Sequence, residues 1–325
     1  MKIQTFVKSP LRLSLFGGGT DIPYIYKELG RGCTITAALD LFVAVGCSSL
    51  PFFNGIKLKY SNNETVQKLD SIIHPIFKEA LSYFDYDPLN NNGLELISTA
   101  SIPSGTGLGS SAAFTTSLVQ CLSMHLKDEK IDQKSLLEIS TKIEHLSGND
   151  QIGYQDQVSS IFGSITKAIY HENNIEIIPA SINWKNGMRN LLEKKGYLYK
   201  TNSRKGISSN FINKEELKTK LNHYEKVLSI AEKVNVNSDN FNENEILDFF
   251  IENSMLAKKV KVRTKEIKEF EDEITKYGAV YTKQLGAGGG GFIFCIFEDE
   301  NPKLPKDILK NMIRPKIIES GTTIL

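Results

Sequence analysis

The chain has 325 residues, 40% hydrophobic and 24% charged, and its 39 basic and 38 acidic side chains leave a formal net charge of +1. This balance is ordinary for a globular protein and gives no reason to expect a nucleic acid or an anionic membrane as partner. No apolar run reaches transmembrane length, and the N-terminus lacks the apolar core of a signal peptide. We therefore expect a cytoplasmic protein whose widely spaced cysteines are reduced and buried, namely Cys33, Cys47, Cys121 and Cys295.

The first segment alternates like a β-strand on either side of a Ser-Pro pair. Residues 2–7 and 11–16 are predicted as two separate strands. Arg12 lies on the second of them and alternates with leucines. From this stretch alone, a solvated charge on an edge strand is the favoured interpretation of Arg12.

Three consecutive glycines, residues 17–19, follow these strands. Neither strands nor helices favour glycine, so the run lets the backbone turn sharply or lets a ligand lie against it. Thr20 and Asp21 come next and offer a hydroxyl and a carboxylate, which suit hydrogen bonding to a polyol.

Strands then alternate with one helix. Residues 33–50 predict two strands or one bent strand, and residues 56–60 predict a further strand. Apolar residues between 66 and 84 keep helical spacing, and Pro75 within that run predicts either a kink or a helix that begins there. A strand over 94–99 leads into the middle of the chain.

A glycine-rich loop at residues 101–111 separates that strand from a long apolar run, 112–126, which predicts a buried helix. This order points backbone N–H groups and the positive end of a helix dipole at one place, where a phosphate binds readily. Ser110 and Ser111 can cap the helix, contact a phosphate or ligate a metal. The loop lacks the Walker A lysine and the third Rossmann glycine. A tight turn with a serine cap is the alternative, and the three alternating glycines favour phosphate binding over it.

Two carboxylates follow this helix. Glu144 lies near the end of a helix predicted over 136–146, where the dipole disfavours a negative charge. It is therefore either a solvated residue or one compensated by a cation. Asp156 stands among amide side chains before an apolar run, which predicts a helix cap or a catalytic carboxylate at a helix start.

The composition shifts near residues 179–187, which predicts two domains, 1–185 and 186–325. A Gly-x-Gly-x-x-Gly match at 286–291 precedes a strand rather than a helix, which excludes a Rossmann site. The second half is otherwise expected to contain a strand, a polar loop, three helices and two strands, at 196–200, 202–209, 213–231, 246–260, 264–277, 279–285 and 292–297.

Three glycine-rich loops near the start, middle and end of one chain resemble the motifs of the GHMP small-molecule kinases. Residues 10–21 are similar to the first motif, 102–113 match the second, which is the ATP phosphate loop, and 283–292 match the third. The resemblance implies an α+β fold with an N-terminal domain resembling ribosomal protein S5 domain 2 and a ferredoxin-like C-terminal domain. ATP and a sugar would meet between the two.

The first and third motifs are most similar to the branch of the family that phosphorylates the anomeric hydroxyl of D-glycero-D-manno-heptose 7-phosphate. The resemblance thus implies a sugar-1-kinase that uses ATP and Mg²⁺ to make the 1,7-bisphosphate. Galactokinases have Glu and His where Gly18 and Gly19 stand, which argues against plain galactose. Two alternatives stay open: another sugar, such as fucose, galactose or unphosphorylated heptose, and a non-catalytic sensor of sugar and ATP.

The resemblance also implies roles for individual residues. Asp156 would accept or orient the proton of the sugar hydroxyl, and Arg12 would lie beside it and stabilise the transferring phosphoryl group. Ser111 and Glu144 would hold Mg²⁺. The ATP phosphates would lie against one continuous stretch: Pro103, Ser104, Gly105, Thr106, Gly107, Leu108, Gly109, Ser110 and Ser111.

The sugar would contact residues from three separate loops. Arg204 and Lys205 would pair with the 7-phosphate of the substrate. The remaining sugar contacts implied are Gly18, Gly19, Thr20, Asp21, Gly288 and Gly289. The expected partners are thus a small sugar or sugar phosphate and no nucleic acid or membrane, in a monomer or homodimer.

Overall fold

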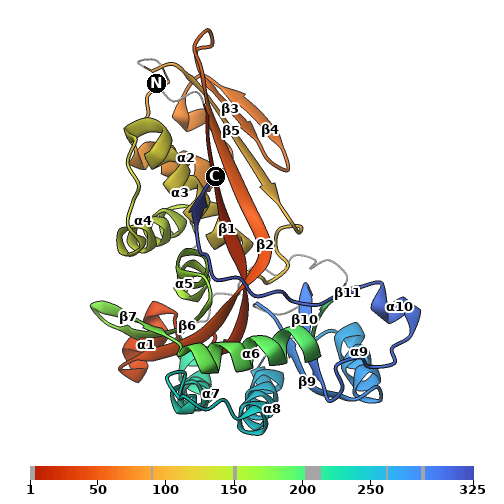
Figure 1. Cartoon of the computed structure of the whole chain (residues 1–325). Helices are drawn as coiled ribbons and strands as arrows, with labels where there is room; N and C mark the ends of the chain where they lie inside the picture. Colours follow the sequence, from red (N-terminus) through yellow and green to blue (C-terminus); the bar gives the residue numbers. More distant parts are fainter. Residues whose placement is uncertain (1–3, 89–90, 149–151, 202–213, 261–262, 287–289) are drawn as a thin grey trace.

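The computed structural model describes residues 4–88, 91–148, 152–201, 214–260, 263–286 and 290–325. The larger of its two sheets has eight strands and runs most of the height of the molecule (Figure 1). The order along it is β12-β1-β2-β5-β3-β4, and β6 pairs with both β2 and β7. The strands are β1 (Gln4–Phe16), β2 (Gly32–Leu50), β3 (Ile56–Lys59), β4 (Asn63–Val66), β5 (Gly93–Ala100), β6 (Ile165–His171), β7 (Asn174–Pro179) and β12 (Thr323–Ile324).

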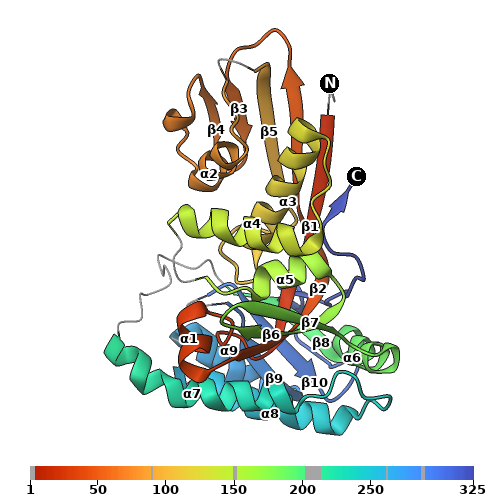
Figure 2. The same cartoon turned by 90° about the vertical axis from the view of Figure 1, so that its left-hand side faces the viewer.

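Helices from residues 75–162 lie on one side of the upper part of this sheet (Figures 1 and 2). Of these, α3 is buried on nearly every face and packs directly on β1 and β2. It therefore brings the loop before it to the lower end of β5, in the middle of the molecule. The helices are α2 (Pro75–Tyr83), α3 (Ser110–Leu122, with a π-helical extension Ser123–Lys127), α4 (Gln133–Leu146) and α5 (Gln155–Phe162), and the short segments α1 (Pro23–Leu29) and η1 (Leu69–Ser71) complete this half.

The second sheet is antiparallel, with the order β11-β8-β10-β9, and lies at the lower end of the molecule. One of its faces packs against α9 through a small apolar core that contains Phe270, Ile274 and Ile293. The strands of this sheet are β8 (Gly196–Lys200), β9 (Ala279–Gln284), β10 (Phe292–Phe297) and β11 (Met312–Ile313). The helices of this part of the chain are α6 (Ile182–Lys195), α7 (Lys214–Lys233), α8 (Glu243–Val260), α9 (Lys265–Thr275) and α10 (Lys306–Leu309).

The mixed sheets and helices confirm the expected α+β fold class. The proposed boundary at 185/186 falls inside α6, and β12 returns from the C-terminal end of the chain to pair with β1. The larger core also contains buried residues from both halves of the sequence, such as Phe16 and Phe250, whose rings lie 4.5 Å apart. The division into 1–185 and 186–325 therefore stays a prediction.

Two local expectations change. The prediction of two N-terminal strands is wrong, because β1 continues through Pro10 with an irregular register between Pro10 and Arg12. At such an irregularity the missing N–H of proline is tolerated. Pro75 begins α2 rather than kinking a longer helix, and Val66 belongs to β4.

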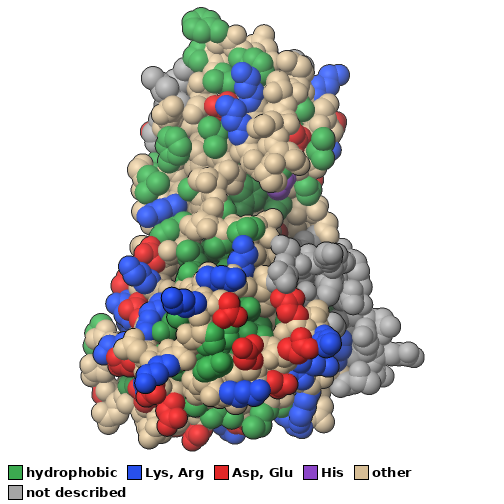
Figure 3. Space-filling view, turned by 90° about the vertical axis from the view of Figure 1, so that its right-hand side faces the viewer, with side chains coloured by type: hydrophobic (Ala, Val, Ile, Leu, Met, Phe, Trp, Pro, Cys, Tyr) green, Lys and Arg blue, Asp and Glu red, His purple; other side chains and the backbone are tan. Residues whose placement is uncertain are grey.

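The four cysteines are free and buried, as expected. Among the described residues, no helix combines the length and apolar character needed to cross a membrane. On the face shown in Figure 3, acidic and basic side chains are interspersed over the lower half of the molecule. That mixture agrees with a formal net charge of +1.

Candidate active site

Arg12 and Asp156 form a partly buried, bidentate ion pair. Arg12 Nε donates to Asp156 Oδ1 at 2.7 Å, and Nη2 donates to Oδ2 at 3.0 Å. The Arg12 side chain is 4% exposed, whereas that of Asp156 is 29% exposed. The interpretation of Arg12 as a solvated charge is therefore wrong. Strand β12 pairs with β1 only at Val7 and Lys8, but at Arg12 the phosphate loop covers this edge, and the guanidinium bonds Asp156 of α5. The pair leaves the carboxylate as its accessible member.

The same arginine also holds the phosphate loop. Arg12 Nη1 donates to the carbonyl of Gly107 at 2.5 Å, and the backbone N–H of Arg12 donates to the carbonyl of Leu108 at 3.0 Å. Asp156 lies in the first turn of α5, where the helix dipole favours a negative charge. One strand residue thus fixes both the loop and the carboxylate.

Glycine is required where this loop passes the ion pair. Gly109 has φ +76°, and a Cβ built there would lie 3.2 Å from Asp156 Oδ2 and 3.1 Å from Arg12 Cγ. The backbone at the start of α3 therefore lies directly against the carboxylate. A phosphate on these N–H groups would be within reach of an acceptor hydroxyl bonded to Asp156.

The other loop glycines have different roles. A Cβ on Gly107 would lie 2.6 Å from the carbonyl of Leu285, so Gly107 allows the third glycine motif to pack against the second. The N–H of Phe292 joins the same two motifs by donating to the carbonyl of Thr106 at 3.1 Å. Gly105 has φ +74° and open space within 4 Å of its Cβ position, which leaves its backbone accessible.

Ser111 and Glu144 meet beside the loop, as the family resemblance implies. Ser111 Oγ donates to Glu144 Oε1, and Gln157 Nε2 donates to Glu144 Oε2 at 2.6 Å. Glu144 is 2% exposed, and burial, with a smaller contribution from the charge of Asp156, raises its pKa to about 7. It is not a solvated residue, and within the described ranges no basic side chain pairs with it. Of the two interpretations, the one that remains is a carboxylate compensated by a cation that the described residues do not supply.

This pair fits Mg²⁺. The described residues contain no group of three or more His, Cys, Asp or Glu side chains that could hold a metal by themselves. A hydroxyl and a carboxylate are the hard oxygen ligands that Mg²⁺ takes, and it completes its shell with water and phosphate oxygens. Ser111 and Glu144 are thus suited to a metal that arrives with a nucleotide.

The first glycine loop differs from the expectation. Thr20 is fully buried; its hydroxyl lies 2.8 Å from the carbonyl oxygen of Gly17 and accepts from the N–H of Cys33 at 3.0 Å. Asp21 is 1% exposed and accepts from the N–H groups of Gly19 at 2.9 Å and Gln155 at 3.0 Å. Burial raises the pKa of Asp21 to about 6. The two side chains join the loop to β2 and α5, and this bonding does not support the expected contact to sugar hydroxyls.

Gly18 and Gly19 are partly exposed, and a Cβ on Gly19 would lie 2.8 Å from the Tyr224 ring of α7. Their backbone stays a candidate for substrate contact. The other predicted sugar contacts, Arg204, Lys205, Gly288 and Gly289, lie outside the described residues.

Two further residues of the site were not predicted. Gln157 is one of the amide side chains around Asp156, and no sequence pattern links it to Glu144. Lys283 is 6% exposed, and its Nζ donates to the carbonyls of Ser14 and Leu15, both at 3.0 Å. It thereby connects β9 to the strand that carries Arg12. Lys283 is the first residue of the third motif, 283–292, and that position is the signal that could have identified it.

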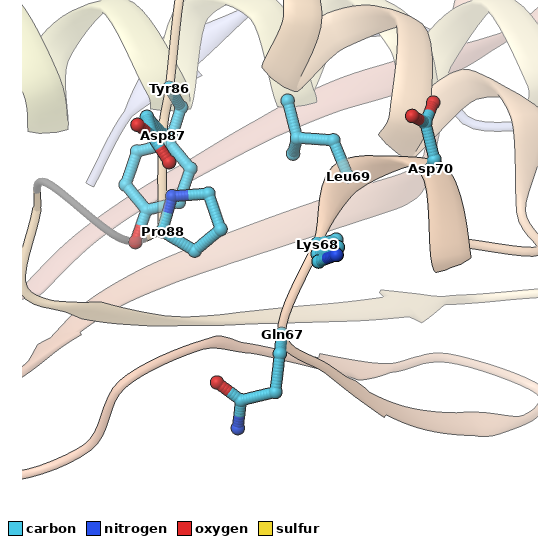
Figure 4. Close-up of a pocket in the computed structure, with 7 residues that line it drawn as sticks. All are labelled: Gln67, Lys68, Leu69, Asp70, Tyr86, Asp87 and Pro88. Atoms are coloured by element: carbon cyan, nitrogen blue, oxygen red, sulfur yellow. The ribbon is translucent and has the colours of Figure 1, made fainter.

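A pocket elsewhere in the structure is not part of this site (Figure 4). The pocket begins at Gln67, directly after Val66 of β4. Val66 pairs in register with Ile56 of β3, and Ile56 pairs with Leu94 at the start of β5. The phosphate loop follows the other end of β5. The residues that line the pocket are Gln67, Lys68, Leu69, Asp70, Tyr86, Asp87 and Pro88.

Comparison with known proteins agrees with this geometry. A curated D-glycero-alpha-D-manno-heptose 7-phosphate kinase from Campylobacter jejuni is 27% identical over 322 residues, covering 91% of this chain and 90% of the relative. A D-glycero-D-manno-heptose 1-phosphate kinase from Bacteroides thetaiotaomicron has a TM-score of 0.72 at 17% identity, covering 99% of this chain and 98% of that one. For the mevalonate kinase of Methanococcus jannaschii the TM-score is 0.69 at 17% identity, covering 96% and 98%. At these identities the solved structures show a shared fold.

Two family models match the chain directly. The GHMP kinases N terminal domain matches residues 75–164, which include the phosphate loop, Glu144 and Asp156. The GHMP kinases C terminal domain matches residues 234–311, which include the third glycine motif. Together they cover more than half of the sequence, and the chain belongs to the GHMP kinase family, whose members transfer a phosphoryl group from ATP to an acceptor hydroxyl.

Proposed function

We propose that this kinase transfers the γ-phosphate of ATP to the anomeric hydroxyl of D-glycero-D-manno-heptose 7-phosphate, giving the 1,7-bisphosphate. The observation that carries the chemistry is the contact between Gly109 and the Arg12–Asp156 pair. The heptose substrate is supported by the curated relative, which matches this chain over 91% of its length.

Asp156 accepts the proton of the attacking hydroxyl, or orients that hydroxyl, in this proposal. Its carboxylate is the exposed member of the ion pair, and Arg12 fixes its plane through two hydrogen bonds. The guanidinium also lies beside Gly107 and Gly109, so its charge stabilises negative charge on the transferring phosphoryl group.

The loop from Pro103 to Ser111 binds the ATP phosphates through its backbone N–H groups and the N-terminus of α3. Ser111 Oγ and the Glu144 carboxylate hold Mg²⁺, which when bound neutralises phosphate charge. Arg204 and Lys205 are proposed to pair with the 7-phosphate, and the backbones of Gly18, Gly19, Gly288 and Gly289 to border the sugar. We propose the cytoplasm as the compartment, supported by four free, buried cysteines, and a monomer or homodimer as the assembly.

An ADP-release assay with Mg·ATP and a small panel of acceptors tests this function. The panel contains D-glycero-D-manno-heptose 7-phosphate, unphosphorylated heptose, mannose 6-phosphate, galactose and fucose. Turnover confined to the heptose phosphate is expected. Turnover with a neutral sugar would keep the kinase and move the substrate within the family, and silence with all five while ATP binds would contradict the proposal.

A further inference from the structure

Gln157 has a buried amide that the chemistry above does not use. It is the third residue of α5, follows Asp156 directly and is 1% exposed. Its Nε2 donates to Glu144 Oε2 at 2.6 Å, while its Oε1 has no hydrogen-bond partner among the described residues. Buried amide oxygens are almost always paired, so this one indicates a donor that the described residues do not supply.

The orientation of the amide follows from its neighbour in the form that binds a metal. Ionised Glu144 accepts hydrogen bonds and does not donate them, so the amide nitrogen faces Glu144 and the oxygen is left over. Glu144 also accepts from Ser111 Oγ at the start of α3. The unpaired oxygen therefore belongs to a side chain that contacts Glu144 directly, and Glu144 and Ser111 are the two expected metal ligands. The oxygen itself is shielded from bulk solvent.

The missing donor has a chemical candidate. Mg²⁺ bound by one or two protein oxygens and by phosphates keeps several water molecules, and these waters are strong hydrogen-bond donors. We propose that Gln157 is a positioning residue for the metal that accompanies ATP: its amide nitrogen orients Glu144, and its amide oxygen accepts from a metal-bound water. This inference rests on the metal assignment of the proposed function and is independent of which sugar is phosphorylated.

The test measures metal binding by the full chain with ADP, without turnover. Mn²⁺ serves as the probe, its affinity is measured by electron paramagnetic resonance in the presence of ADP, and ADP affinity without metal is measured by calorimetry in EDTA. In Gln157→Leu we expect Mn²⁺ affinity to fall about tenfold or more while metal-free ADP affinity stays within about twofold of the wild type. The matched control is Ser159→Ala, which removes another buried, unpaired polar atom from α5 and should leave both affinities unchanged.

A second variant keeps the inference testable if Gln157→Leu does not fold. Gln157→Glu retains an acceptor and adds a negative charge beside Glu144, so in EDTA its unfolding temperature should fall. Adding Mn²⁺ and ADP should then raise that temperature by more than it does in the wild type, because the cation relieves the repulsion.

The outcomes are distinct. Unchanged Mn²⁺ affinity in folded Gln157→Leu, or equal losses of metal and metal-free nucleotide binding, would overturn the role of Gln157. Equal metal-dependent stabilisation of wild type and Gln157→Glu would do the same. If the wild type binds ADP but no Mn²⁺, the metal assignment fails and this inference fails with it, whereas failure of the heptose assay alone would leave both intact.

Discussion

Asp156 and Glu144 lie on neighbouring helices but at opposite helix ends. Asp156 is near the positive, N-terminal end of α5, and Glu144 is near the negative, C-terminal end of α4. Asp156 is in the first turn of α5, accepts two hydrogen bonds from Arg12 and stays partly exposed. Glu144 is in the last turn of α4, is buried, and is bonded only to neutral donors within the part of the chain that the structure describes. The protein compensates the first carboxylate itself. For the second, the described residues supply no cation, and in the proposed function Mg²⁺ would take that place.

The difference explains how two carboxylates beside one phosphate loop keep separate tasks. A carboxylate that an arginine orients and that stays open to the substrate can accept a proton. A carboxyl with a pKa raised to about 7 by burial exchanges its proton for a metal ion at little cost near neutral pH. Changing either environment should therefore change a different measurable property.

The largest expected effect is on turnover in Asp156→Asn. The amide keeps the shape of the side chain and one acceptor for Arg12, but it cannot take a proton, so kcat should fall about 10²–10⁴-fold. ADP-release kinetics with saturating Mg·ATP measure this. A loss of less than about tenfold would mean that Asp156 only orients the acceptor or that another group is the base.

Arg12 is expected to be nearly as sensitive, and lysine should not replace it. Arg12→Lys keeps a positive charge but cannot form both hydrogen bonds to Asp156 and a third to the carbonyl of Gly107. We expect kcat to fall about 10²–10³-fold. Kinetics of Arg12→Lys beside Arg263→Lys, the same change at an arginine that pairs with the buried Glu271 of α9, would show whether the loss is specific to the Arg12–Asp156 pair.

Glu144→Gln should separate stability from metal binding. The folded pKa of about 7 lies above the ordinary value of 4.5, so this group contributes stability below pH 4.5 that is lost as the pH rises to about 7. Without metal, the unfolding free energy of Glu144→Gln at pH 8 should therefore exceed that of the wild type by on the order of 1–3 kcal/mol, which raises its unfolding temperature. At pH 4 the variant should show no advantage. Thermal unfolding in EDTA at the two pH values measures this, and equal stability at pH 8 would contradict the burial argument.

The smallest effect is expected in the first glycine loop. Thr20→Val leaves the N–H of Cys33 without its acceptor, so the unfolding free energy should fall by about 1–3 kcal/mol. The KM for sugar should change little, because Thr20 is fully buried. Denaturant unfolding and steady-state kinetics of the same preparation check both, and a large rise in KM with unchanged stability would restore the direct sugar contact.

Much of the fold followed from local sequence signals. The strand–glycine–helix order around residues 101–126 identified the phosphate loop, and Pro75 and Thr264 begin helices where proline and threonine favour a start. The continuous β1 strand could not be predicted, because Pro10 is accommodated by a register irregularity that depends on β2. Local rules do not contain that partner.

The site shows the same limit. Residue types indicated Ser111, Glu144 and Asp156 as candidates, and the family resemblance added Arg12, but the distances among them arise from packing of β1, α3, α4 and α5. The hydroxyl of Thr20 and the carboxylate of Asp21 had suitable chemistry for a polyol, yet tertiary bonds to Cys33, Gly19 and Gln155 occupy them. Gln157 gave no signal, because its partner is Glu144 on another helix.

The most direct test of the division between the two carboxylates is the Mg²⁺ dependence of turnover in Asp156→Asn and Glu144→Gln, assayed side by side. Glu144→Gln should need about 10- to 100-fold more Mg²⁺ for half-maximal rate and should recover much of its turnover at high Mg²⁺. Asp156→Asn should keep the wild-type Mg²⁺ dependence and stay slow at every concentration. Recovery of Asp156→Asn by Mg²⁺, or an unchanged Mg²⁺ requirement in Glu144→Gln, would contradict the account.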